Sequence, residues 1–348
     1  MSREKRILFD IVHPAHVHFF KNILWGLESK GHKTAIAARD KEVTLELLDR
    51  YALPYQSLTQ ASAVTLWQRF GELLVRDWRL LQMCRSFKPD IICSRNPSGV
   101  QVARLLGIPG FFDTDDGPKI GLHYSIAAPF ASVITTPQCL KEDCGPKHIR
   151  YPGYKQSAYL HPDHFSPNPE VLGLLGLQPG ERFFVVRFVA MNAIHDRTES
   201  GLGMEEKKRL ISRLQGHGRV FISSEGPLPE MWQHLQISLP AHLVHDILAF
   251  ADLLVGDSQT MAMEAACLGT PSLRVNSMLF TSNLDDLEKK YGLVYSFSPD
   301  DSVAFFSKLD SMLSHPNLKQ TVAGDHQRML DDTVNVAEWY QDLILKHI

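Results

Sequence analysis

The stretch from Leu253 to Asn276 constrains the fold of this 348-residue chain more than any other. It opens with a short apolar run that is typical of a buried strand, and Gly256 and Asp257 end that run. From Ser258 the apolar residues recur at three-to-four-residue spacing, which predicts a helix, and Gly269 with a nearby proline ends it. A strand, a tight turn, a helix and a further strand therefore follow one another, as in α/β proteins with parallel sheets.

The start of this helix carries small polar side chains that suit an anion. A helix N-terminus presents free main-chain N–H groups and the positive end of the helix dipole, so we expect Ser258, Gln259 and Thr260 to contact a diphosphate, with Asp257 beside them. Glu264 lies one turn past Thr260 on the same face, where its carboxylate can accept hydrogen bonds from a ribose diol. The alternative is an ordinary helix start capped by Ser258, which would explain Asp257 and Ser258 without a ligand.

The stretch resembles the nucleotide-sugar signature of GT-B glycosyltransferases and of non-hydrolysing UDP-N-acetylglucosamine 2-epimerases. In those families a strand end is followed by Gly- and Ser-rich residues on the diphosphate, by a Glu on the ribose and by a Leu-Gly-x-Pro turn. The resemblance is closest to DUF354, a bacterial and archaeal group within that superfamily. In one departure, Gln259-Thr260 replaces the usual second glycine of the turn, which narrows the approach of the backbone to a ligand.

The composition excludes several classes of protein. A net charge of −3 gives no overall attraction to nucleic acid, and hydrophobic and charged fractions of 44% and 22% are typical of a soluble globular protein. Five cysteines, an odd and small number, favour a reduced cytoplasmic protein. The apolar run after the charged N-terminus is too short for a signal peptide, and no later run is long enough to span a membrane.

Three histidines follow the first predicted strand, which runs from Arg6 to Val12. His13, His16 and His18 lie in the loop before a helical run that extends from Phe19 to Gly31, and a second strand follows that helix. Their spacing matches no standard zinc arrangement, so we expect no metal. A histidine near neutrality can take a proton from an acceptor hydroxyl, and the alternative is that the three side chains tie down the loop by hydrogen bonds.

The placement of His16 is similar to that of the Gly-His loop in nucleotide-sugar glycosyltransferases. Counted back from the glycine that ends the helix, His16 falls where that family keeps its catalytic base, although Ala15 replaces the preceding glycine. His13, beside Pro14, is the competing candidate, and His18 is expected to contact the acceptor.

Two further strand ends in the first half carry polar residues. Asn96 and Ser98 follow one strand and are predicted to hold acceptor hydroxyls, with helix capping by Ser98 as the alternative. Asp113 and Asp115 follow the next strand. Asp113 is expected to orient a base, and Asp115 is expected to bind the acceptor. A plain turn is the alternative.

The second half repeats the order of strand, loop and helix after a proline-rich linker. Arg187 follows its first strand and is expected to neutralise charge on a leaving diphosphate. Ser224 and Glu225 follow the next strand and are expected near the sugar. His245 is expected near the nucleobase, and this expectation rests on the resemblance alone.

We therefore expect an α/β protein of GT-B type, with two Rossmann-like domains whose parallel sheets face each other across a cleft. The N-terminal acceptor domain is predicted over residues 1–155, the linker over 156–180 and the nucleotide-sugar-binding domain over 181–348, with the last helix packing back on the N-terminal domain.

The expected function is a glycosyltransferase that uses a nucleotide-sugar, UDP-linked, in cell-surface glycan biosynthesis, without a cofactor or an essential metal. The acceptor would be a glycan or a lipid-linked saccharide, and the basic and aromatic helix over residues 66–87 could rest on the inner face of the membrane or be an ordinary core helix. A 2-epimerase, with Asp113, Asp115 and Glu225 moving a proton at C2 of the sugar, and a non-catalytic nucleotide-sugar-binding protein are the alternatives.

Overall fold

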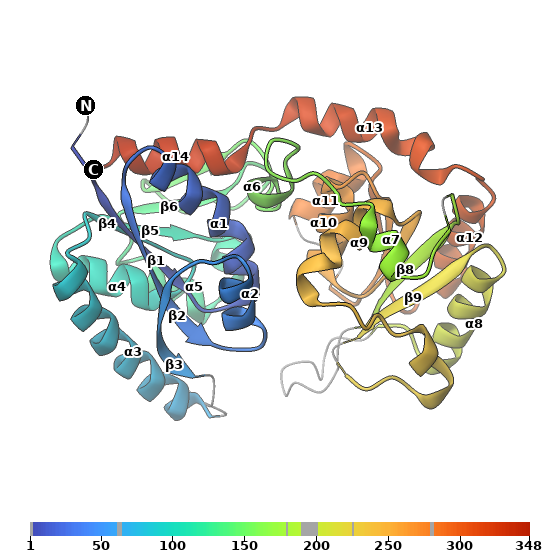
Figure 1. The fold of residues 1–348 in the computed structure, drawn as a ribbon, viewed down its shortest axis with the longest axis horizontal. Coiled ribbons are helices and arrows are strands. Elements are labelled where there is room, and N and C mark those ends of the chain that lie inside the picture. The colour runs from blue at the N-terminus through green and yellow to red at the C-terminus, as the bar shows by residue number, and fades with distance from the viewer. Residues whose placement is uncertain (1–2, 61–64, 179, 189–200, 225, 279–281) are drawn as a thin grey trace. The chain divides into compact units, whose positions relative to one another are not determined.

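A computed structural model describes residues 3–60, 65–178, 180–188, 201–224, 226–278 and 282–348. The chain divides into two compact units, which are considered separately (Figure 1). The first unit comprises Met1–His164 together with Thr333–Ile348, and the second comprises Phe165–Asp332. The predicted linker is thus shared between the two units, because the first unit extends to His164.

The first unit is built on a seven-stranded sheet. Its strands are β1 (Arg6–Ile11), β2 (Lys33–Asp40), β3 (Tyr55–Gln60), β4 (Ile91–Ser94), β5 (Gly110–Asp113), β6 (Val133–Pro137) and β7 (His148–Tyr151). Its helices are α1 (Pro14–Ser29), α2 (Thr44–Arg50), α3 (Leu66–Phe87), α4 (Pro97–Leu106), the 3-10 turn η1 (Gly117–Ile120), α5 (Leu122–Ala127), α6 (Ser157–Leu160) and α14 (Val336–Lys346). No strand is predicted from the sequence over the residues that form β7.

All strands of this sheet run parallel, in the order β3-β2-β1-β4-β5-β6-β7. The chain reverses its direction of travel across the sheet between β1 and β4, which are neighbours although β2 and β3 separate them in sequence. In open parallel sheets, ligands bind outside the carboxyl ends of the strands at such a reversal. The ends of β1 and β4 carry the histidines and the Arg95–Ser98 segment, respectively.

Helices cover both faces of the first sheet (Figure 1). Helices α1, α6 and α14 pack against one another, so the C-terminal helix belongs to the first unit. Helices α3, α4 and α5 form the other layer. Because both faces are covered, the central strands are apolar almost throughout, as Ile7, Leu8 and Phe9 of β1 illustrate with no exposed surface.

The second unit is built on a five-stranded parallel sheet. Its strands are β8 (Phe183–Phe188), β9 (Arg219–Ser224), β10 (Leu253–Gly256), β11 (Ser272–Val275) and β12 (Val294–Phe297). Its helices are α7 (Glu170–Leu174), α8 (Met204–Gln215), the 3-10 turns η3 (Glu230–Leu235) and η4 (Ala241–Leu243), α9 (Val244–Phe250), α10 (Gln259–Cys267), α11 (Ser282–Lys289), α12 (Ser302–Leu313) and α13 (Leu318–Asp332).

The strand order β12-β11-β10-β8-β9 places the reversal of this sheet between β8 and β10. Alternate residues of β8 enter two separate cores: Phe184 and Val186 pack with α8 and α12, and Phe183 and Val185 pack with α9 and α10. The sequence therefore predicted the fold class correctly, since both halves are α/β with wholly parallel sheets.

The structure also bears on the state of the cysteines and on membrane-spanning helices. The five cysteines are all free thiols. Within the parts of the chain that the structure describes, no helix has the length and apolar character needed to cross a bilayer.

Candidate functional site

The reversal between β8 and β10 in the second unit brings several predicted nucleotide contacts to one sheet edge. Arg187 of β8 lies directly beside Gly256 of β10. A Cβ atom on Gly256 would lie 2.3 Å from the carbonyl oxygen of Arg187, so only glycine allows the two strands to approach this closely. The main-chain N–H of Asp257 then donates to the same carbonyl oxygen at 3.3 Å, which fixes the start of the turn.

Helix α10 begins beyond this turn with Ser258 as its N-cap residue. Oγ of Ser258 accepts a hydrogen bond from the N–H of Met261 at 3.4 Å, so the capping role does exist. Capping satisfies one donor of the first turn, whereas the N–H groups of Gln259 and Thr260 have no acceptor within the helix. Ser258, Gln259 and Thr260 are all partly exposed, so an anion can reach this end of the helix.

Glu264, predicted at the ribose, is buried and lies close to His245, predicted near the nucleobase. Oε1 of Glu264 is 3.2 Å from Nε2 of His245, and both side chains are less than a tenth exposed. The ring of Phe165 meets the imidazole edge-on, with centroids 6.2 Å apart. The structure thus brings Glu264 and His245 together beneath the start of α10.

The remaining predicted contacts of the second unit lie at the ends of its strands. Nη1 of Arg187 donates to Oγ of Ser223 at 2.7 Å, next to Ser224 at the end of β9. Asn276, which the sequence analysis did not single out, donates from Nδ2 to the carbonyl oxygen of Asp257 at 3.2 Å and braces the turn from β11. Glu225 lies outside the described residues.

In the first unit, His13 occupies the N-cap position of α1. Its Nδ1 accepts the N–H of Ala15 at 3.2 Å, and its Nε2 lies 3.6 Å from the carboxylate of Glu42. Burial, followed by the positive charge of Lys41, lowers the pKa of His13 to about 4. His13 is therefore neutral at pH 7.

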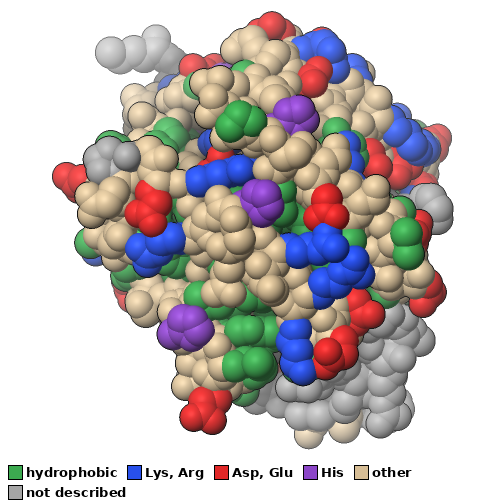
Figure 2. All heavy atoms as spheres, turned by 90° about the vertical axis from the view of Figure 1, so that its right-hand side faces the viewer, with side chains coloured by type: hydrophobic (Ala, Val, Ile, Leu, Met, Phe, Trp, Pro, Cys, Tyr) green, Lys and Arg blue, Asp and Glu red, His purple; other side chains and the backbone are tan. Residues whose placement is uncertain are grey.

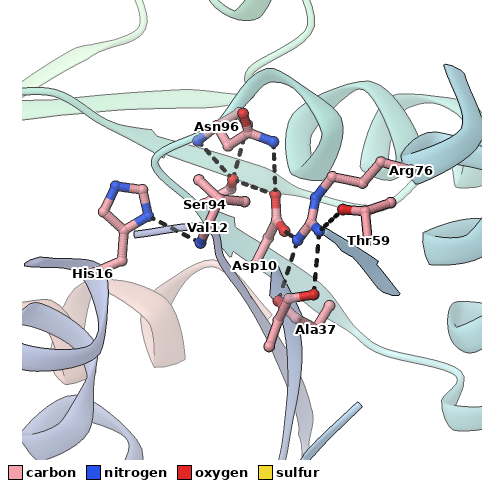
Figure 3. Close-up of polar contacts among 9 residues, drawn as sticks. Asp10, Val12, His16, Ala37, Thr59, Arg76, Ser94 and Asn96 are labelled. Atoms are coloured by element: carbon pink, nitrogen blue, oxygen red, sulfur yellow. Dashed lines mark hydrogen bonds and ion pairs between the residues drawn. The ribbon is translucent and has the colours of Figure 1, made fainter. Parts of the chain in front are cut away.

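His16 is oriented in the same way, three residues into the helix. Its Nδ1 accepts the main-chain N–H of Val12 at 3.4 Å (Figure 3). Burial, reinforced by the positive charge of Arg95, holds the pKa of His16 well below its usual value. A neutral imidazole that accepts at Nδ1 carries its proton on Nε2, so in this orientation Nε2 is a hydrogen-bond donor.

The third histidine lies apart from the other two. His18 is buried, its ring stacks on Tyr159 with centroids 5.5 Å apart, and it meets the ring of Tyr51 edge-on. Its Nδ1 lies 3.5 Å from the hydroxyl of Tyr51. The hydrogen bonds of His13 and His16 match the alternative in which histidines tie down the loop, and His18 packs in the core of the unit.

The acidic residues after β5 form a charged cluster with two cations. Arg95 forms ion pairs with Asp113 and, at 3.0 Å, with Asp115, and Nζ of Lys155 lies 2.6 Å from Oδ2 of Asp115. Asp113 also accepts from the hydroxyl of Thr135 at 2.9 Å.

The two carboxylates of this cluster titrate differently. Burial raises the pKa of Asp113 to about 6 against the attraction of Arg95. Burial acts in the same direction on Asp115, but Arg95 and Lys155 outweigh it and hold the pKa of that carboxyl at about 2. The two carboxylates thus belong to one ion-pair network with Arg95 and Lys155.

A second buried network lies beneath the end of β1 (Figure 3). The carboxylate of Asp10 pairs with Arg76 and accepts from Oγ of Ser94 at 3.0 Å and from Nδ2 of Asn96 at 3.3 Å. Arg76 also donates to the carbonyl oxygens of Ala37 and Ala38 and, at 3.1 Å, to Thr59. One guanidinium therefore joins the ends of three strands to α3.

This network corrects one expectation and qualifies another. The basic residues of the helix over residues 66–87 were expected at its surface, but Arg76 of that helix is only 3% exposed, because its charge is matched by the buried Asp10. Ser98 does not cap α4, because Asn96 holds the N-cap position. Ser98 is fully buried beside Asp77, whose pKa burial raises to about 6.

Among the described residues, no group of three or more His, Cys, Asp or Glu side chains is arranged to hold a metal ion. Figure 2 shows one face of the described residues, on which Lys and Arg side chains lie beside Asp and Glu side chains. Such a mixture lacks the single-sign character of a nucleic-acid interface on that face.

This chain is similar to one protein family and to several solved structures. A family model described as "Protein of unknown function (DUF354)" matches residues 5–282. No curated protein matches the sequence.

Solved structures share the fold at low sequence identity. UDP-GlcNAc 2-epimerase from Neisseria meningitidis bound to UDP-GlcNAc is 12% identical, with a TM-score of 0.65 over 98% of this chain and 99% of that one. The 2-epimerase from Methanocaldococcus jannaschii is also 12% identical, with a TM-score of 0.62 over 90% and 94%. The spinosyn forosaminyltransferase SpnP is 14% identical, with a TM-score of 0.65 over 99% and 100%. At these identities the comparison shows the GT-B fold, which both epimerases and glycosyltransferases adopt.

Proposed function

The chain belongs to the DUF354 family, and we propose that it is a glycosyltransferase that takes a UDP-linked sugar as donor in cell-surface glycan biosynthesis. The observation that carries the proposal is the edge of the second sheet between β8 and β10. There a glycine-dependent turn leads into a helix whose first residues, Ser258, Gln259 and Thr260, are partly exposed. The Neisseria meningitidis epimerase, which has the same fold, is bound to UDP-GlcNAc in its structure, and this supports a nucleotide-sugar as the ligand.

In this proposal the second unit binds the donor. The N–H groups of Gln259 and Thr260 and the guanidinium of Arg187 would hold the diphosphate and stabilise its charge as the bond to the sugar C1 breaks. Glu264 would contact the ribose, with His245 fixing the position of its carboxylate.

The first unit would supply the acceptor chemistry. As the acceptor oxygen bonds to C1, its proton must pass to a base, and UDP leaves with the electrons of the C1–O bond. His16 and His13 have low pKa values and are therefore unprotonated at pH 7, as a base requires. Each would have to turn its ring to release Nδ1 from the main-chain N–H that it now accepts. Asp113 would position Arg95 in this cluster, and Asn96 and Asp115 would contact the acceptor.

A 2-epimerase is the second candidate, and the orientation of the two histidines favours it. With Nε2 protonated, His16 is a hydrogen-bond donor, and the carboxylates after β5 would then supply the acid and base. The pKa of Asp113, raised to about 6, lies near the range that proton transfer at C2 of the sugar requires.

The proposal is tested with the intact protein and a panel of UDP-sugars without an acceptor. NMR of the donor would separate the outcomes: slow hydrolysis supports the transferase, and a second UDP-sugar epimer supports the epimerase. UDP that raises the melting temperature without turnover of any donor, even with a broad acceptor panel, would indicate a binding protein. No shift with UDP would overturn nucleotide-sugar binding altogether.

A further inference from the structure

Helix α3 carries an apolar stripe on the side that faces away from the sheet. Phe70, Leu74, Val75 and Trp78 are 56%, 53%, 46% and 61% exposed. Their spacing of three and four residues places them on adjacent turns, whereas Arg76 and Leu80 of the same helix are buried on the opposite side. The outward side of a surface helix is normally polar, so this arrangement is the reverse of the usual pattern.

The charge on this outward side is one-sided. Helical geometry places Arg85, which is exposed, two turns beyond Trp78 on the same side. Of the two carboxylates of α3, Glu72 pairs with Arg39, and Asp77 is half-buried beside Ser98. Among the described side chains, the stripe therefore combines apolar surface with a positive group.

A polar groove of about 610 Å³ runs beside the stripe, between α3 and the edge strand β3. It is lined by hydroxyl, amide and charged side chains that suit a saccharide, together with two aliphatic ones: Ser57, Leu58, Thr59, Gln60, Gln68, Glu72, Val75 and Arg79. Val75 belongs to both the groove and the stripe, so the polar and apolar surfaces are continuous. The groove involves the last residues of β3, at the same sheet edge as His16 and Asn96.

We propose that the groove and the stripe together bind a lipid-linked saccharide, with the sugar in the groove and the start of the lipid chain along α3. From Phe70 to Trp78 the stripe is about 12 Å long, at 1.5 Å per residue, which matches roughly ten methylene groups. This inference rests on the proposed function, because it names the chemical class of the acceptor.

The test measures binding without nucleotide, so its failure is distinct from a failure of UDP binding. Decyl β-glycosides of glucose, N-acetylglucosamine and maltose, each below its critical micelle concentration, would be titrated by calorimetry beside the same sugars without a chain. We expect at least one decyl glycoside to bind ~10-fold or more tightly than its parent sugar, the gain expected when a few methylene groups leave water.

Four variants then locate the site. Leu74→Ser and Phe70→Ser should reduce the preference for the decyl glycoside to within ~2-fold. Ser57→Phe should fill the groove and weaken every glycoside, because Ser57 is exposed on an edge strand that tolerates an aromatic residue. Leu105→Ser, at an apolar residue of α4 that is 72% exposed, is the matched control and should change neither quantity.

Two results would overturn the inference. One is the absence of binding by all three decyl glycosides. The other is a pair of observations. Wild-type protein floats with phosphatidylglycerol vesicles and Leu74→Ser does not, while Ser57→Phe binds the glycosides as wild type does. That pair would identify α3 as a surface that docks on a bilayer instead.

Discussion

Nδ1 of His16 lies 3.4 Å from the main-chain nitrogen of Val12 and accepts its hydrogen. This contact places the proton of the neutral ring on Nε2. We expect ¹⁵N NMR of labelled histidines to show His16 as the Nε2–H tautomer at pH 7 and still neutral at pH 6, since burial and Arg95 lower its pKa. A His16→Gln variant identifies the resonance, and an Nδ1–H tautomer or an imidazolium at pH 6 would contradict the assignment.

The lowered pKa values of His16 and His13 also predict a pH dependence of stability. Both groups favour the neutral form in the folded state, so the unfolded chain binds more protons once the pH falls below 6.5. Their contribution to the free energy of unfolding is full above pH 6.5 and is lost as the pH falls toward 4.

Asp113, with its pKa raised to about 6, contributes the opposite slope over part of this range. The comparison is therefore between wild type and a His13→Asn, His16→Gln double variant, by urea unfolding at several pH values. The variant should lose less stability than wild type between pH 7 and pH 4.5, and parallel curves would exclude the histidines as the cause.

The Asp10–Arg76 pair predicts a strongly non-additive mutant cycle. Arg76→Met leaves a buried carboxylate, and Asp10→Leu leaves a buried guanidinium, so each should lower the free energy of unfolding by about 3–5 kcal/mol. The double variant removes both charges and should lose less than the sum. Additive losses in urea denaturation would show that the pair is not coupled.

Glu264 is expected to affect both stability and nucleotide binding. Glu264→Ala removes a buried partner of His245 and should lower the free energy of unfolding by about 1–3 kcal/mol. If the carboxylate also contacts the ribose, UDP should bind more weakly by a similar amount. Glu264→Gln keeps the shape and one acceptor, so it should retain most of the stability. Calorimetry with UDP on both variants separates the two roles, since unchanged affinity would remove Glu264 from the site.

Gly256 provides a sharper test of the turn before α10. In Gly256→Ala the new methyl group would meet the Arg187 carbonyl oxygen at 2.3 Å, so β8 and β10 must separate. We expect a loss of about 1–3 kcal/mol in stability and loss of UDP binding. Gly324→Ala, in α13 with no atom within 4 Å of the added Cβ, is the control. It should leave UDP binding unchanged and raise stability by about 0.5–1 kcal/mol.

The sequence predicted the elements that depend on local pattern. Apolar runs ended by glycine or by polar residues gave β1 and β10, and the capped start and glycine end of α10 were correctly placed. The same reasoning missed β7, because His148–Tyr151 is a short edge strand in which only Tyr151 is buried, and it lacks a continuous apolar run.

Local pattern could not assign partners to charged residues. In sequence, Arg76 does not differ from the other arginines of an amphipathic helix. It is buried because it pairs with Asp10, which lies 66 positions away in the chain. The aspartate gave the available signal, since a carboxylate at the end of an otherwise apolar strand requires a buried partner. Likewise, the spacing of Thr260 and Glu264 placed them on one helical face but could not reveal that His245 lies against Glu264.

By itself, the sequence determined two parallel α/β sheets and the positions of their strand ends, because hydrophobic period and turn chemistry are local properties of the chain. Only the tertiary structure decided which strands are neighbours, and hence that Arg187 meets Gly256 and that Arg76 meets Asp10. Strand order depends on burying both faces of each sheet at once, and that free energy is shared among residues far apart in sequence.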